Sequence, residues 1–177
     1  ALTGYIEEKP DANEFARFDI LLDGNYTSWI KFANSLRLRL AMRLASVVPD
    51  KAQGEIGKIK KNGYGVFETV TEKVAVSTQS GYTNPLGELN LVWNETYMSA
   101  PMESILTGYN DPRLEVYFKP CTDVEFKNEY RGIRQGTCFA HNHYAGLSKL
   151  SVTQSTDAPL MTASEIWFLR AEAALRG

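Results

Sequence analysis

One short segment carries the side chains that most resemble metal ligands. Cys138, His141 and His143 lie within six residues, and Cys121 could supply a fourth ligand. On a strand, His141 and His143 would project to the same face, and two cysteines with two histidines are typical of structural zinc. The spacing, however, matches no common zinc finger. The simpler interpretation is two loop histidines and two small cysteines, which could form a disulfide in an exported protein. We therefore expect no metal and no cofactor.

The sequence also contains no recognisable arrangement of catalytic side chains. Glycoside hydrolysis needs two carboxylates about 5–10 Å apart, but no acidic pair stands in a recognisable context. The available pairs are Glu7 with Glu8, Asp123 with Glu125, and Glu165 with Glu172. The sequence contains no G-x-S-x-G nucleophile elbow, no Walker loop and no G-x-G-x-x-G motif. We therefore expect no catalytic residue, and a glycan-active enzyme stays open only as a lesser alternative.

Aromatic and polar side chains occur together in the loop-rich part of the chain. Phe, Trp and Tyr make up 11% of the residues. Sugars stack their apolar faces on aromatic rings, while amide and guanidinium groups hydrogen-bond the hydroxyls. On this chemistry alone, the candidate ligand-binding residues are Trp93, Asn94, Tyr97, Tyr130, Arg131 and Tyr144.

The composition excludes several classes of partner. The chain has 177 residues, of which 44% are hydrophobic and 23% charged, as in an ordinary globular domain. Its 19 Lys and Arg against 21 Asp and Glu give a net charge of −2, so no basic field is present to bind nucleic acid. No uncharged apolar run reaches the roughly 18 residues that a membrane span needs.

The most regular element expected is a pair of helices near the N-terminus. Residues 27–46 are apolar around most of a helical circumference, which is typical of a helix packed between neighbours. Thr27 is the expected N-cap, and Pro49 prevents the helix from continuing. A second, short helix at 50–61 follows a tight connection, which predicts an antiparallel helical hairpin over about 27–62.

The remainder of the chain is less regular. We expect a loop-rich region over about 64–160 and a terminal helix over about 162–176, which Thr162 and Glu165 would open as a capping box. The apolar stripe of this last helix has nothing after it to cover it, so we expect a piece of a longer protein. Within the loop-rich region the sequence predicts a strand in 66–76, a turn at 84–87, a helix at 97–108 and a possible strand at 113–118.

Two segments resemble a known family. Asp23-Gly24-Asn25 followed by WIKFANSLRLRLAMRLA (Trp29–Ala45) is similar to the signature segment of the SusD/RagB-like family of nutrient-binding outer-membrane lipoproteins, in its SusD-like subgroup. Residues 159–162 leading into SEIWFLRAEAALRG are similarly specific. Three shorter pieces follow the order usual in the family, at 61–63, 84–86 and 110–114.

The resemblance implies a mainly α fold, in which a TPR-like helical scaffold carries long irregular loops and a few short strands. Residues 1–177 would be one fragment of a single SusD-like domain. Members are tethered by a lipidated N-terminal cysteine, which this chain lacks, to the outer face of the outer membrane of Gram-negative, Bacteroidetes-type bacteria. There they capture oligosaccharides without cleaving them and pass them to a SusC-like TonB-dependent transporter.

Two functions therefore remain open. The first is non-catalytic oligosaccharide binding through the loop-rich region. The alternative is a scaffold for contact with the transporter, with the ligand site outside this chain.

Overall fold

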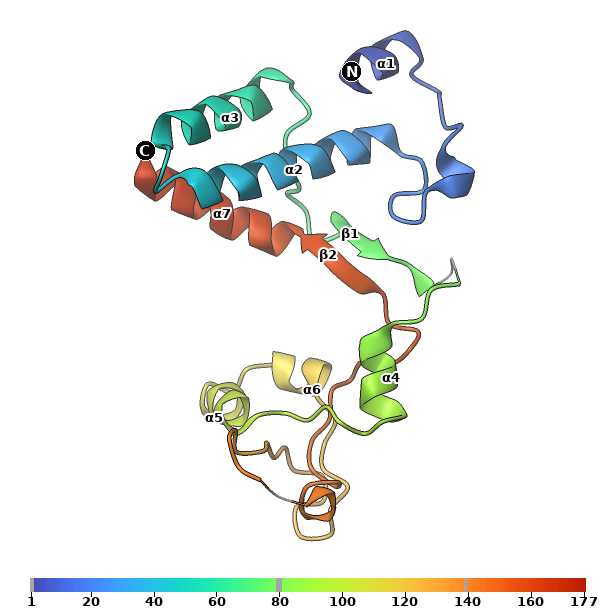
Figure 1. The fold of residues 1–177 in the computed structure, drawn as a ribbon, viewed down its shortest axis with the longest axis vertical. Coiled ribbons are helices and arrows are strands. Elements are labelled where there is room, and N and C mark those ends of the chain that lie inside the picture. The colour runs from blue at the N-terminus through green and yellow to red at the C-terminus, as the bar shows by residue number, and fades with distance from the viewer. Residues whose placement is uncertain (1, 79–80, 139) are drawn as a thin grey trace. The chain divides into compact units, whose positions relative to one another are not determined.

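The computed structural model describes residues 2–78, 81–138 and 140–177 (Figure 1). The chain divides into two compact units: unit 1 comprises residues 1–80 and 158–177, and unit 2 comprises residues 81–157. Most of the regular structure is helical, and the described part of the chain has one two-stranded sheet. The predicted mainly α fold with long loops is confirmed. Among the described residues, no helix is both long enough and apolar enough to cross a bilayer.

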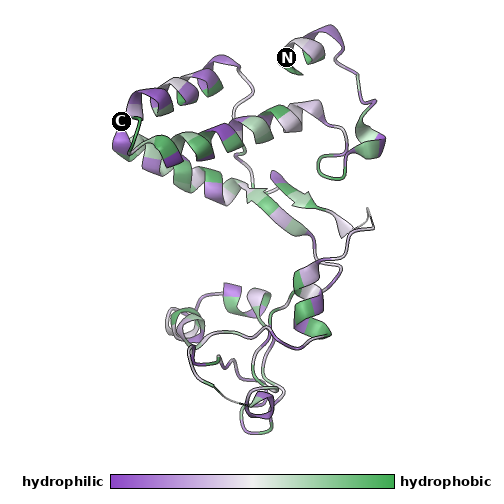
Figure 2. Cartoon of the chain, in the orientation of Figure 1, coloured by the Kyte–Doolittle hydropathy of each residue, from purple (hydrophilic) through white to green (hydrophobic). Residues whose placement is uncertain are grey.

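Three helices form the body of unit 1. Helix α2 (Tyr26–Leu44) packs against both α3 (Pro49–Lys61) and α7 (Ala163–Arg176), as Figure 1 shows. Hydrophobic residues are frequent along α2 and α7, whereas α3 is more hydrophilic (Figure 2). The structure thus has a helical hairpin, formed by α2 and α3, and a terminal helix, α7. The buried core of this unit comprises Leu38, Met42, Ile59, Val66, Phe67, Val74, Met161, Ala163 and Ile166.

Helix α2 is capped by Asn25 and not by the expected residue. The N-cap is Asn25, whose side chain accepts a hydrogen bond from the Ser28 amide at 2.8 Å. The prediction of Thr27 as N-cap is wrong by two residues, because Asn25 lies where the backbone is still extended. The preceding segment contains α1 (Leu2–Glu8) and the 3-10 turn η1 (Ala16–Phe18).

The small sheet joins two segments of unit 1 that are distant in the sequence. Strand β1 (Lys73–Val76) pairs antiparallel with β2 (Ala158–Thr162), which leads directly into α7. The strand expected within 66–76 is thus confirmed. Thr162 is the N-cap of α7 but makes no side-chain cap bond. The capping box is wrong, because Glu165 instead binds the Arg39 guanidinium through two contacts of 2.5 Å.

Unit 2 is built from short helices and paired loop segments. Its helices are α4 (Pro85–Leu91), α5 (Ala100–Gly108), α6 (Arg113–Tyr117) and the 3-10 turn η3 (His141–His143). Buried Met98, Leu106 and Phe118 form its core. The helix predicted at 97–108 is confirmed with a later start.

Two local predictions in unit 2 are wrong. The expected turn at 84–87 is the start of α4, because the Asn84 side chain accepts a hydrogen bond from the Leu86 amide and Pro85 occupies the first helical turn. The possible strand at 113–118 is helix α6, and only Phe118 pairs as a bridge, with Leu150. Asp111 favours the helix, since its carboxylate accepts from the Arg113 amide at 2.9 Å.

Candidate functional site

Paired loop segments of unit 2 direct Tyr97 and Lys149 away from the core. Tyr97 forms an isolated antiparallel bridge with Lys149, and the Met98 amide donates to the Ser148 carbonyl at 2.8 Å. Met98 and Ser148 are both buried. Because side chains alternate between the two faces of an extended segment, Tyr97 and Lys149 project to the face opposite their buried neighbours.

Three aromatic rings meet on this outer face. The rings of Tyr97 and Tyr144 lie 5.1 Å apart at 84°, and those of His141 and Tyr144 lie 5.2 Å apart at 79°. His141 opens the turn η3 and Tyr144 directly follows it, so the two residues are three positions apart and their side chains lie on the same side of the turn. We call Tyr97, His141 and Tyr144 the Tyr97 cluster.

A hydrogen-bond network around the Tyr97 cluster determines which of its atoms donate and which accept. The Lys149 ammonium donates to Asn94 Oδ1, since an ammonium has no acceptor. The other end of the Asn94 amide, Nδ2, therefore faces His141 Nε2 at 2.9 Å. His141 must accept there, so its ring proton lies on Nδ1 when the network is formed. The Tyr97 hydroxyl lies 3.2 Å from the same nitrogen.

The backbone of Asn94 and the pKa of the Tyr97 hydroxyl both depart from ordinary values. Asn94 has φ of +60°, a left-handed conformation that asparagine adopts more readily than most residues. Burial, followed by the neighbouring Tyr144, raises the pKa of the Tyr97 hydroxyl above its ordinary value of 10.0. Tyr97 therefore remains a neutral hydrogen-bond donor at physiological pH.

A hollow of about 330 Å³ opens beside two rings of the Tyr97 cluster. Its walls combine these rings with hydroxyl, amide, carboxylate and thiol groups, which is the mixture that ligand sites use to hold polar molecules. The lining residues are Glu95, Tyr97, Met98, Ser99, Ile133, Gln135, Thr137, Cys138 and Tyr144.

The structure brings three of the six candidate binding residues together, namely Asn94, Tyr97 and Tyr144. Tyr130 instead packs against the buried core of unit 2, where burial and then Glu115 raise the pKa of its hydroxyl. The Arg131 guanidinium pairs with Glu103 at 3.1 Å and Glu129 at 2.8 Å.

Trp93, the remaining candidate, is 61% exposed after the end of α4. Within the described part of the chain it has no ring contact with the Tyr97 cluster.

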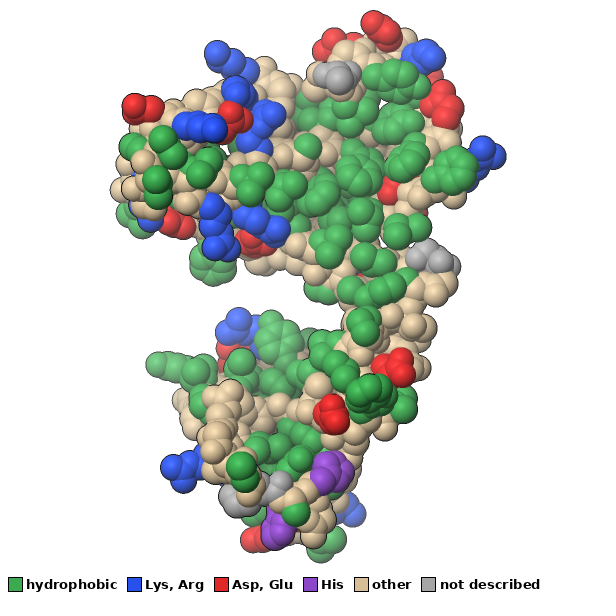
Figure 3. All heavy atoms as spheres, viewed as in Figure 1, with side chains coloured by type: hydrophobic (Ala, Val, Ile, Leu, Met, Phe, Trp, Pro, Cys, Tyr) green, Lys and Arg blue, Asp and Glu red, His purple; other side chains and the backbone are tan. Residues whose placement is uncertain are grey.

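Sequence reasoning missed His141 and Lys149 as members of this site. Both meet Asn94 only through folding, since His141 lies 47 residues and Lys149 lies 55 residues away along the chain. Both histidines are exposed, and the purple side chains of Figure 3 mark them on the surface. No short-range pattern in the sequence indicated this grouping.

The alternative set of zinc ligands is not assembled in the described part of the chain. No three or more His, Cys, Asp or Glu side chains gather there as a metal site would require. Cys121 is buried, with its Sγ 3.4 Å from Ser148 Oγ, whereas Cys138 is exposed. Both cysteines are free, so the disulfide alternative is not formed either.

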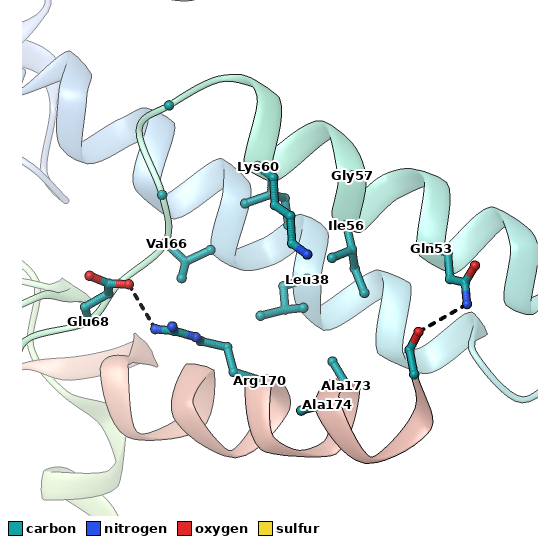
Figure 4. A pocket seen from close by; sticks show the side chains of 14 residues that line it. Leu38, Gln53, Ile56, Gly57, Lys60, Val66, Glu68, Arg170, Ala173 and Ala174 are labelled. Atoms are coloured by element: carbon teal, nitrogen blue, oxygen red, sulfur yellow. Dashed lines mark hydrogen bonds and ion pairs between the residues drawn. The ribbon is translucent and has the colours of Figure 1, made fainter.

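Unit 1 contains a larger hollow, of about 700 Å³, between α3 and α7 (Figure 4). Leu38, Ile56, Val66 and Ala173 contribute apolar walls, and an ion pair between Arg170 and Glu68 closes one end. Among the residues that the structure describes, no aromatic ring lines this hollow. It therefore lacks the flat surface on which a sugar ring stacks, and the smaller hollow of unit 2 is the better candidate for carbohydrate.

Known proteins are similar to this chain in both sequence and fold. The model of the SusD-like family, described as SusD and RagB outer membrane lipoproteins, matches residues 1–177. A SusD homologue from Bacteroides vulgatus ATCC 8482 is 42% identical with a TM-score of 0.86, covering 99% of this chain and 36% of its own. A comparison with curated proteins finds no match.

Two further solved structures agree. A chitin-binding SusD homologue from Flavobacterium johnsoniae is 38% identical with a TM-score of 0.87. A SusD-like protein from Bacteroides thetaiotaomicron VPI-5482 is 33% identical with a TM-score of 0.84. In both cases the alignment covers 99% of this chain and 36% of the other. The chain thus spans little more than a third of the length of these proteins.

Proposed function

The chain belongs to the SusD-like family of SusD and RagB outer membrane lipoproteins, and from this premise we propose that it binds oligosaccharides without cleaving them. The observation that carries the proposal is the Tyr97 cluster beside the 330 Å³ hollow. Rings supply stacking surfaces for the apolar faces of a sugar, and the polar walls supply partners for its hydroxyls.

The proposal extends to the protein's place in the cell. We propose that it acts on the outer face of the outer membrane, held there by a lipidated N-terminal cysteine outside this chain. It would release its ligand to a SusC-like TonB-dependent transporter. The family description, which names outer membrane lipoproteins, supports the location. A similar structure described as chitin-binding makes chitooligosaccharides the first ligands to test.

The proposed ligand contacts are centred on the two tyrosines that line the hollow. Tyr97 and Tyr144 would stack on sugar rings, and Asn94 would hold His141 and Lys149 in place around them. Trp93 stays a proposed outer contact, since its ring is exposed. Tyr130 and Arg131 would support the site from the core and from an ion pair, without touching the ligand.

Ring substitution in the full-length protein tests the proposal. Tyr97→Ala and Tyr144→Ala should each weaken calorimetric binding of a chitooligosaccharide series by several-fold to about tenfold, because each aromatic contact contributes on the order of 1 kcal/mol. Tyr109→Ala is the matched control, since this tyrosine of the same unit is 83% exposed. Unfolding temperatures of all three variants show whether the fold is intact.

The outcomes separate the proposal from its rivals. Binding with no new reducing ends, lost in the two ring variants and kept in the control, supports it. Turnover that disappears when a single carboxylate is changed would establish a glycan-active enzyme. Unchanged binding in both ring variants would favour the alternative, a scaffold for the transporter with the ligand site elsewhere. The hollow of unit 1, which no aromatic ring lines among the described residues, is the feature consistent with that alternative.

A further inference from the structure

Lys149 is a half-buried cation without a counter-ion in the described part of the chain. Its ammonium donates to Asn94 Oδ1 and lies 5.5 Å from the centroid of the Tyr97 ring. Within residues 2–78, 81–138 and 140–177 it forms no ion pair with a carboxylate. Arg131 of the same unit is different, because Glu103 and Glu129 both neutralise it.

The neighbours of Lys149 orient its charge without neutralising it. An ammonium has three N–H donors, and Asn94 is the one hydrogen-bond partner of this ammonium found in the described residues. The Tyr97 ring attracts a cation through its negative face, but the effect is small where water has access. Removing a charge from water costs free energy unless an opposite charge compensates. The site is therefore prepared for an anionic group that the described residues do not supply.

We propose that the natural ligand is an acidic saccharide whose carboxylate, as in a uronic acid residue, binds the Lys149 ammonium. This inference rests on the proposed function and names the ligand class for the same site. The sugar ring that carries the carboxylate packs against the Tyr97 cluster, while the next residues extend into the hollow.

The charges around the hollow also indicate which end of the ligand carries the acidic group. Glu95 lines the hollow and forms no ion pair with Lys149 in the described residues. A second carboxylate beside Glu95 would be repelled, since like charges at close range are unfavourable. The acidic group therefore occupies the Lys149 end, and the hollow accepts neutral parts of the saccharide.

Matched acidic and neutral saccharides test this inference in the full-length protein. The probes are neutral oligosaccharides that end in a single galacturonate, mannuronate or glucuronate residue, each compared by calorimetry with its methyl ester, which keeps the sugar and removes the charge. We expect at least one acid form to bind about tenfold tighter than its ester, as a charge-assisted hydrogen bond would give. The preference should shrink as salt is added, because Lys149 is only half-buried.

Variants assign the preference to Lys149. Lys149→Met keeps a stem of similar length and should bring the affinities of the acid and its ester together, whereas Lys149→Arg should keep a preference for the acid. Lys127→Met, which removes an exposed cation of the same unit, should change nothing. Unchanged discrimination in Lys149→Met would overturn the inference, and so would equal binding of acids and esters by the unmodified protein.

The experiment also distinguishes failure of this inference from failure of the proposed function. If neutral chitooligosaccharides bind through Tyr97 while no acid is preferred over its ester, the binding function stands and the acidic ligand is wrong. If no saccharide of either kind binds, both are wrong.

Discussion

Replacing Asp19 should destabilise unit 1 more than any other single carboxylate change at its N-terminal loop. Asp19 is 7% exposed, and its carboxylate accepts four hydrogen bonds. Oδ1 accepts from the amides of Leu21 and Leu22 at 3.0 and 3.1 Å. Oδ2 accepts from the Gly24 amide at 2.8 Å and from the Trp29 indole at 2.7 Å. One side chain therefore ties the loop to the first turns of α2.

The magnitude follows from the donors that would be left without a partner. A hydrogen bond to a charged group contributes about 1.5–3 kcal/mol, but bonds that share one carboxylate are not additive. We expect Asp19→Ala to lower the free energy of unfolding by about 3–5 kcal/mol. Trp29→Phe removes the indole donor together with part of the ring, and should cost about 1–2 kcal/mol.

Urea titration followed by far-UV circular dichroism measures these changes. Asp11→Ala is the matched control, because Asp11 is exposed, and it should stay within about 0.5 kcal/mol. In the double variant Asp19→Ala/Trp29→Phe, the part of the Trp29→Phe cost that comes from the lost hydrogen bond should disappear, since the acceptor is already gone. A loss below about 1 kcal/mol for Asp19→Ala would refute the reasoning.

The pH dependence of the same carboxylate has a defined sign. Burial alone would raise the pKa of Asp19, but hydrogen bonds from Trp29 and from three backbone amides outweigh it, so the pKa lies below 3.8. The stabilisation is therefore present above pH 3.8 and is lost as the pH falls through the lower pKa of the folded state. Asp19→Ala should remove this part of the acid sensitivity.

Three further substitutions test the packing at two glycines and the pH dependence at Glu72. In Gly87→Ala the new Cβ would lie 2.2 Å from the Thr153 carbonyl carbon, so we expect a loss of about 2–3 kcal/mol. Gly54 lies within α3, and a Cβ there would meet open space, so Gly54→Ala should raise the free energy of unfolding by about 0.5–1 kcal/mol. Equal urea midpoints for the two variants would contradict this contrast. Burial alone would raise the pKa of Glu72. Hydrogen bonds from Lys31 and two backbone amides outweigh this effect and lower the pKa to about 2. Stability should therefore fall by up to about 3 kcal/mol between pH 4.5 and pH 2. Glu72→Gln should flatten this part of the pH profile, and parallel profiles would disprove its role.

Much of unit 1 follows from short-range signals in the sequence. The apolar circumference of α2 and the Pro49 punctuation predict a helical hairpin, and the structure has one. These signals are reliable because the helical period and the proline backbone act within a few residues. The same range explains the error at Thr27, since Asn25 is an equally suitable cap and only the extended loop before α2 selects it.

In unit 2 the sequence was informative about chemistry and less so about placement. The six candidate residues were chosen for stacking and hydrogen bonding, and three of them meet at one place. Tyr130 has the same side-chain chemistry as Tyr97, yet it packs on the core. Nothing within a few residues of either tyrosine distinguishes a ring beside the hollow from a ring that packs on the core, because their segments are irregular.

By itself, the sequence determined the helical class, the main helices of unit 1 and the aromatic, polar character of the loops. Only the tertiary structure decided that Lys149 lies over Tyr97 beside Asn94 and His141. The reason is physical: helix signals are local, whereas this site forms through backbone pairing between segments about 50 residues apart, and no local periodicity records such pairing.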